Sequence, residues 1–65
     1  MLSEIEKEII KAMCKYDMNI SNVSMSMVYH RNSVIYHIGK IIKKTGLDPR
    51  KFYDLLKLKE MCEEK

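Results

Sequence analysis

The apolar residues of this 65-residue chain recur at intervals of three and four, in four stretches separated by polar or turn-forming residues. This spacing places apolar side chains along one face of an α-helix. No stretch alternates apolar and polar residues as a half-buried strand does. We therefore expect an all-α fold, built as a single domain over residues 1–65, because a chain this short has room for one small core.

Capping and stop signals divide the chain into four expected helices. The first begins at Ser3, where Glu6 three residues later completes a capping box. Gly46 ends the third, since glycine suits the left-handed position that follows a helix. Asp48 and Pro49 predict the cap and the first residue of the fourth. The expected helices cover residues 3–16, 21–27, 31–44 and 49–62.

The positive charge of the chain is concentrated in its middle third. The net charge is +3, yet the segment 18–47 contains four bases and no acid. Such a segment is the electrostatic footprint of a protein that binds a polyanion. The first residues do not resemble a signal peptide, and no apolar stretch is long enough to span a membrane. We expect a cytoplasmic protein with no membrane partner.

The residues of this chain do not group into a catalytic or metal-binding pattern. Cys14 and Cys62 lie far apart in the sequence, and two reduced thiols on helix flanks are favoured over a disulfide. His30 and His37 are seven residues apart, whereas two histidines on a helix that share a metal are about four apart. We expect no enzymatic activity, no cofactor, no metal and no small-molecule ligand in this domain.

The expected third helix carries residues suited to reading DNA. A short helix, a three-residue turn and a longer basic helix form the helix-turn-helix layout, whose second helix lies in the major groove. Arg31 can pair with guanine, Asn32 with adenine, and Ser33 with a base or a phosphate. The candidate DNA-contacting residues are His30, Arg31, Asn32, Ser33, Tyr36, His37, Lys40, Lys43 and Lys44, with the lysines as phosphate contacts.

Three motifs carry a resemblance to a known family. They are N-I-S at 19–21, H-R-N-S-V-x-Y at 30–36 and T-G-L-D at 45–48. With these motifs nearly the whole chain resembles the C-terminal helix-turn-helix domain of PucR-type transcriptional regulators. A weaker likeness to Fis-type domains covers the two central helices. The resemblance implies sequence-selective binding of double-stranded DNA by a transcriptional regulator, with the third helix as its recognition helix.

Four positions of the third helix depart from the pattern of that family. Ile35 and His37 stand where the family usually has basic residues, Gly39 where it prefers a charged residue, and Lys44 where it prefers an apolar one. Gly39 could permit a close backbone approach or be merely tolerated, at a cost of about 1 kcal/mol relative to alanine. His37 adds a possible pH dependence. The reduced basic character leaves an alternative open, a helical protein-interaction module that binds another regulator instead of DNA.

A single recognition helix gives little affinity, so we expect either a homodimer or a domain within a larger regulator. A dimer would present its two recognition helices roughly 34–36 Å apart, one turn of DNA. Ile10, Leu58 and Met61 are apolar residues beyond the regular stripes, and we expect them to form the dimer contact.

Overall fold

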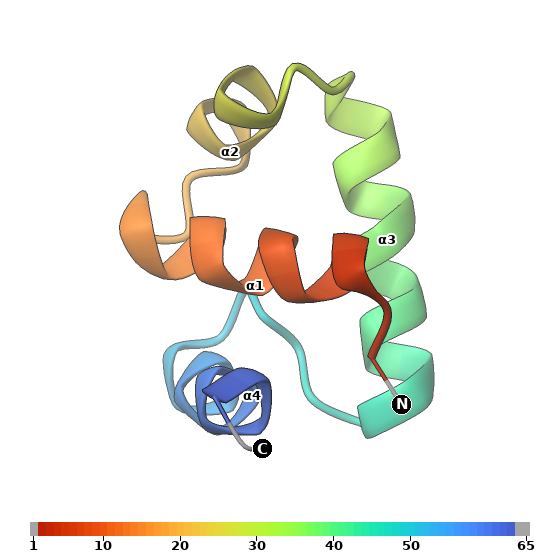
Figure 1. Cartoon of the computed structure of the whole chain (residues 1–65), viewed down its shortest axis with the longest axis vertical. Helices are drawn as coiled ribbons and strands as arrows, with labels where there is room; N and C mark the ends of the chain where they lie inside the picture. Colours follow the sequence, from red (N-terminus) through yellow and green to blue (C-terminus); the bar gives the residue numbers. More distant parts are fainter. Residues whose placement is uncertain (1, 64–65) are drawn as a thin grey trace.

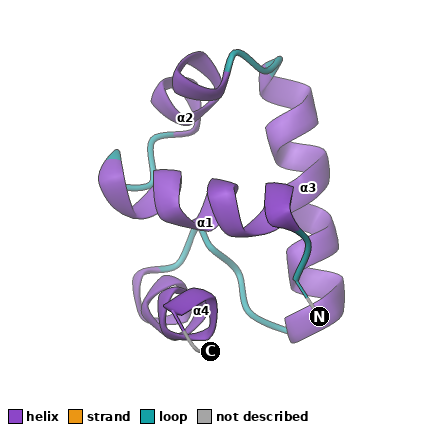
Figure 2. Cartoon of the chain, viewed as in Figure 1, coloured by secondary structure: helices purple, strands orange, loops and turns teal. Residues whose placement is uncertain are grey.

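A computed structural model describes residues 2–63 and contains helices and connecting turns, with no strand in that range. The four helices are α1 (Glu4–Lys15), α2 (Ile20–Met27), α3 (Arg31–Thr45) and α4 (Phe52–Glu63). Helix α1 crosses the middle of the molecule, with α2 on one side of it and α4 on the other (Figures 1 and 2). The predicted all-α fold with four helices is confirmed.

Helix α1 begins with the predicted capping box. The backbone N–H of Glu6 donates to Ser3 Oγ at 3.3 Å, and the backbone N–H of Ser3 donates to Glu6 Oε1 at 2.9 Å. Two of the unpaired N–H groups at the start of the helix are thereby satisfied. The Glu6 side chain is buried, however, because the start of α1 lies against other parts of the fold.

The hydrophobic core is organised around α1, which packs against each of the other three helices. The buried apolar residues come from all four helices and from the segment before α1: Leu2, Ile9, Ile10, Met13, Val23, Val34, Ile38, Ile41, Leu55 and Leu58. Ile10 and Leu58 are fully buried. The expectation that these two side chains form a dimer contact is therefore wrong, because the core of the single chain already buries both of them. Met61 remains exposed.

The connection between α1 and α2 uses an uncommon backbone conformation. Asp17 and Met18 both have positive φ, at 54° and 64°. Asn19 then caps α2 by accepting a hydrogen bond from the backbone N–H of Asn22 at 3.1 Å. Ser24 is buried, and its hydroxyl donates to the carbonyl of Ser21 at 2.9 Å. The polar α2 is thus held by packing and by its cap.

Helix α4 begins three residues later than predicted. Asp48 and Pro49 lie in a turn, closed by a hydrogen bond from the backbone N–H of Lys51 to the carbonyl of Asp48. The Asp48 carboxylate accepts from the backbone and the guanidinium of Arg50, and this pairing holds the pKa of Asp48 below its usual value. The local Asp–Arg contacts stabilise a turn where capping rules alone predicted helix.

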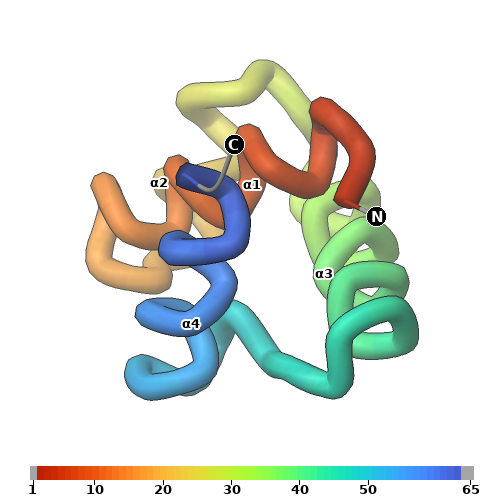
Figure 3. The backbone as a smooth tube through the Cα atoms, turned by 60° about the horizontal axis from the view of Figure 1, so that its bottom comes forward, coloured from red at the N-terminus to blue at the C-terminus, as the bar shows by residue number. Residues whose placement is uncertain are grey.

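Helix α4 lies apart from the two central helices. Across residues 2–63 it contacts α1, whereas α2 and α3 contact each other and α1. Figures 1 and 3 both show α3 and α4 apart from each other and joined by the segment 46–51. The outer surface of α3 is therefore left uncovered by α4.

Cys14 on α1 and Cys62 on α4 are free thiols, and burial raises the pKa of each.

Candidate nucleic-acid interface

The turn between α2 and α3 is a Schellman motif with valine at its left-handed position. The backbone N–H of Tyr29 donates to the carbonyl of Ser24 at 2.9 Å, and that of Val28 donates to Met25 at 3.2 Å. Val28 has φ 57° and ψ 41°, a conformation that normally favours glycine. Its side chain is 89% exposed, so packing does not compensate the backbone strain.

His30 starts α3 as its cap. The Nδ1 atom of His30 accepts a hydrogen bond from the backbone N–H of Asn32 at 3.1 Å, and its carbonyl accepts from Ser33. This arrangement fixes the start of the helix and leaves the other ring nitrogen as a possible donor to a ligand. Arg31, Asn32 and Ser33 occupy the first turn, and all three side chains are exposed.

One face of α3 is buried and the opposite face is open. Val34, Ile38 and Ile41 pack into the core. At about 100° per residue, the stripe directly opposite contains the exposed residues Asn32, Tyr36, Gly39, Lys40 and Lys43. Helix α3 contains no acid, so this surface combines a basic charge with polar and aromatic side chains.

Tyr36 lies at the centre of this outward face. Its side chain is 61% exposed, and Lys40 Nζ lies 5.5 Å from the centroid of its ring. A cation at this distance interacts favourably with an aromatic ring. The contact holds the lysine ammonium beside the tyrosine, on the side of α3 that faces solvent.

His37 lies at the edge of the outward face. Its side chain is half-buried, and its ring meets the ring of Tyr36 edge to face at a centroid distance of 5.3 Å. The Nδ1 atom is buried and has no hydrogen-bond partner within residues 2–63. Of the predicted residues on α3, His37 is thus the least exposed, and its Nδ1 atom is not available at the surface.

Lys44 binds a buried carboxylate. Its Nζ atom lies 2.9 Å from Glu6 Oε1, the same oxygen that accepts from the backbone N–H of Ser3. Burial raises the pKa of Glu6, but the hydrogen bonds from Ser3 and Lys44 lower it more, so the carboxyl pKa lies below its usual value. The ion pair joins the start of α1 to the end of α3, across 38 positions of sequence. Sequence reasoning missed this contact, because only the packing of α1 on α3 creates it.

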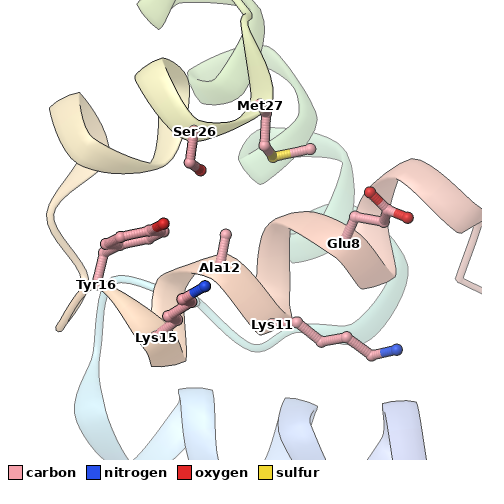
Figure 4. A pocket seen from close by; sticks show the side chains of 7 residues that line it. All are labelled: Glu8, Lys11, Ala12, Lys15, Tyr16, Ser26 and Met27. Carbon is pink, nitrogen blue, oxygen red and sulfur yellow. The ribbon is translucent and has the colours of Figure 1, made fainter.

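A groove between α1 and α2 was also not predicted. It has a volume of about 320 Å³ and is lined by Glu8, Lys11, Ala12, Lys15, Tyr16, Ser26 and Met27. Figure 4 shows these side chains around the open space between the two helices. Lysine and glutamate stand on the same rim, and Lys15 Nζ lies 5.5 Å from the Tyr16 ring centroid. The groove is wide open, and its mixed charges select no particular ligand.

A short helix, a tight turn and a longer basic helix with an open outer face define the helix-turn-helix class of DNA-binding domain. The family model of the PucR C-terminal helix-turn-helix domain matches residues 7–62, and the chain belongs to this family. A search of curated proteins and a search of solved structures found no significant match. Membership indicates a role in DNA-binding regulation of transcription. None of the helices within residues 2–63 combines the length and apolar character needed to cross a membrane.

Proposed function

We propose that this chain binds double-stranded DNA sequence-selectively, with α3 in the major groove, as the DNA-reading part of a transcriptional regulator. The observation that carries the proposal is the outer face of α3. It is exposed over the whole helix, contains no acid, and begins with three exposed polar side chains in the first turn. A helix of this kind fits the major groove, and its first turn comes nearest to the base edges.

The exposed residues divide into base-reading and phosphate-binding groups. Arg31 offers a bidentate donor pair to guanine, Asn32 suits adenine, and Ser33 suits either a base or a phosphate. Lys40 and Lys43 serve as phosphate contacts, because they lie further along the outer face and present single charges.

The remaining candidates have unequal parts in this proposal. His30 caps α3 through its Nδ1 atom, and its other ring nitrogen donates to a phosphate of the DNA near the start of the helix. Tyr36 contacts the DNA from the centre of the face. His37 borders the interface, since it is half-buried. We assign Lys44 to the Glu6 ion pair first, and any phosphate contact it makes is secondary.

The proposal includes a homodimer that places two copies of α3 on one DNA site. Its contact surface is the exposed apolar face of α4 formed by Phe52, Tyr53 and Leu56, whereas the exposed Met61 lies on the opposite side of the helix. The rings of Phe52 and Tyr53 already meet edge to face, at a centroid distance of 5.4 Å. Because α4 contacts α1 alone among the helices of residues 2–63, a second copy bound there leaves α3 free for DNA.

Leu56→Lys tests the dimer. The side chain is 44% exposed, so a lysine there can reach solvent without disturbing the core. We expect the parent chain to sediment as a dimer at micromolar concentration, and the variant as a monomer that keeps the helical circular-dichroism spectrum of the parent but melts at a lower temperature, because it lacks the stabilisation by association. A parent chain that remains monomeric with its DNA bound would contradict this part of the proposal.

Arg31→Ala, compared with Lys43→Ala, tests the DNA contact itself. Loss of the Arg31 guanidinium should weaken binding to the preferred site by about 1–3 kcal/mol and relax the preference at one base pair. Loss of Lys43 should weaken binding to all sequences alike and reduce the salt slope by about one. A change of sequence preference in the Lys43 variant would show that α3 is placed wrongly in the groove.

A further inference from the structure

Gly39 has no structural reason to be glycine. A Cβ atom built at this position would have no atom within 4 Å, apart from the neighbouring turns of its own helix. Its φ is not in the positive region, in contrast to Gly46 at the end of α3. Glycine inside a helix is less favourable than alanine, so this residue weakens α3 without relieving any internal contact.

Ile35 presents a complementary anomaly. It lies one turn before Gly39, on the same side of α3, and its side chain is 40% exposed. An isoleucine side chain that is exposed on a recognition helix is not stabilised by contact with water. Together the two residues make a short apolar stretch on this side of α3, which we call the notch: the Ile35 side chain lies one turn before the bare backbone of Gly39, whose Cβ position has open space around it.

The charged residues around the notch indicate what kind of ligand binds there. Lys43 lies one turn after Gly39, Arg31 one turn before Ile35, and α3 contains no acid. The notch therefore lies between basic side chains, which suit a polyanion. The apolar group that duplex DNA presents in the major groove is the C5-methyl group of thymine.

We infer that the notch formed by Ile35 and Gly39 receives a thymine methyl group and makes this chain select thymine at one or two positions of its site. The inference rests on the proposed function, because it requires α3 to lie in the major groove. Ile35 supplies the apolar contact, and Gly39 lets the helix backbone come close enough for that contact to form.

The experiment replaces thymine by deoxyuridine, which lacks only the C5-methyl group. A preferred duplex is first selected with the full chain from a random pool. Each thymine is then replaced in turn, and affinity is measured by fluorescence anisotropy. We expect replacement at one or two positions to weaken binding on the order of fourfold, the factor that corresponds to burial of one methyl-sized group.

Three variants assign the effect to the notch. Ile35→Ala should bind the thymine and deoxyuridine duplexes equally well, whereas Met25→Ala, an exposed apolar truncation on α2, should keep the difference. Gly39→Ala should raise the melting temperature, because its Cβ meets open space, and weaken binding to the thymine duplex about tenfold. A purely structural role for Gly39 cannot produce this opposite change in stability and affinity.

Several outcomes would overturn the inference. They are a parent chain that binds both duplexes equally at every position, an unchanged deoxyuridine effect in Ile35→Ala, or full affinity in Gly39→Ala. Salt-dependent binding with one of these results would contradict the thymine notch alone. Failure to bind duplex DNA of any sequence would contradict both the notch and the proposed function.

Discussion

Replacing Lys44 by alanine removes the cation that pairs with the buried carboxylate of Glu6. The Glu6 side chain is 3% exposed and the Lys44 side chain 37% exposed. Removal of one partner from a fully buried ion pair costs about 3–5 kcal/mol. Here the lysine is partly solvated, and the carboxylate keeps its hydrogen bond from Ser3 and its place in the first turn of α1. These features reduce the expected loss to about 1–2 kcal/mol.

Thermal unfolding followed by circular dichroism measures this loss. In a domain of this size 1 kcal/mol corresponds to about 4–8 °C, so Lys44→Ala should lower the melting temperature by about 5–15 °C. Lys43→Ala is the matched control, because it removes the same charge one residue away from an exposed position. It should stay within about 0.5 kcal/mol of the parent chain.

The double variant Glu6→Gln with Lys44→Ala shows whether the unpaired charge causes the loss. It should be more stable than Lys44→Ala alone, because the neutral amide is less costly to bury than a carboxylate. The reasoning is refuted if Lys44→Ala has the same melting temperature as the parent chain and weakens DNA binding as much as Lys43→Ala does. Lys44 would then be a phosphate contact and the ion pair would be energetically unimportant.

Three further predictions concern stability. Because the pKa of Glu6 is lower in the folded chain than its usual 4.5, the unfolded state binds the proton first, and the stability that Glu6 contributes is lost as the pH falls through its folded value. The melting temperature of Glu6→Gln should therefore depend less on pH below about pH 5 than that of the parent chain. If both chains lose the same stability as the pH falls, the pKa of Glu6 is not lowered in the folded chain. Val28→Gly should raise stability by about 0.5–1 kcal/mol, since it removes a β-branched residue from the left-handed conformation, although glycine adds entropy to the unfolded chain; a lower melting temperature would disprove the strain. Asn19→Ala removes the cap of α2 and should cost about 1 kcal/mol in the same assay, whereas no change would mean that packing alone holds this helix.

Local patterns in the sequence predicted the features that depend on neighbouring residues. Ser3 and Glu6 form the capping box three residues apart, and Gly46 ends α3 with a positive φ. The buried residues of α3, namely Val34, Ile38 and Ile41, follow the intervals of four and three that predicted the helices. In each case the physical cause lies within one or two turns of helix.

The features that sequence reasoning missed depend on tertiary packing. Ile10 and Leu58 fall outside the regular stripes, but α1 and α4 bury them because α1 lies between other helices and has more than one buried face. The Glu6 partner of Lys44 comes from the far end of the chain, and no local pattern records it. Asp48 and Pro49 satisfy the rule for a helix start, yet the contacts of Asp48 with Arg50 hold them in a turn.

Titration of the chain against a random pool of labelled DNA duplexes, with sequencing of the bound fraction, tests the central claim most directly. The account predicts enrichment of a short motif and a steep loss of affinity as the salt concentration rises. Two half-sites about one turn apart would further support the dimer. The claim that α3 reads the sequence of DNA would be contradicted if no motif were enriched at any salt concentration, or if the chain did not bind DNA at all.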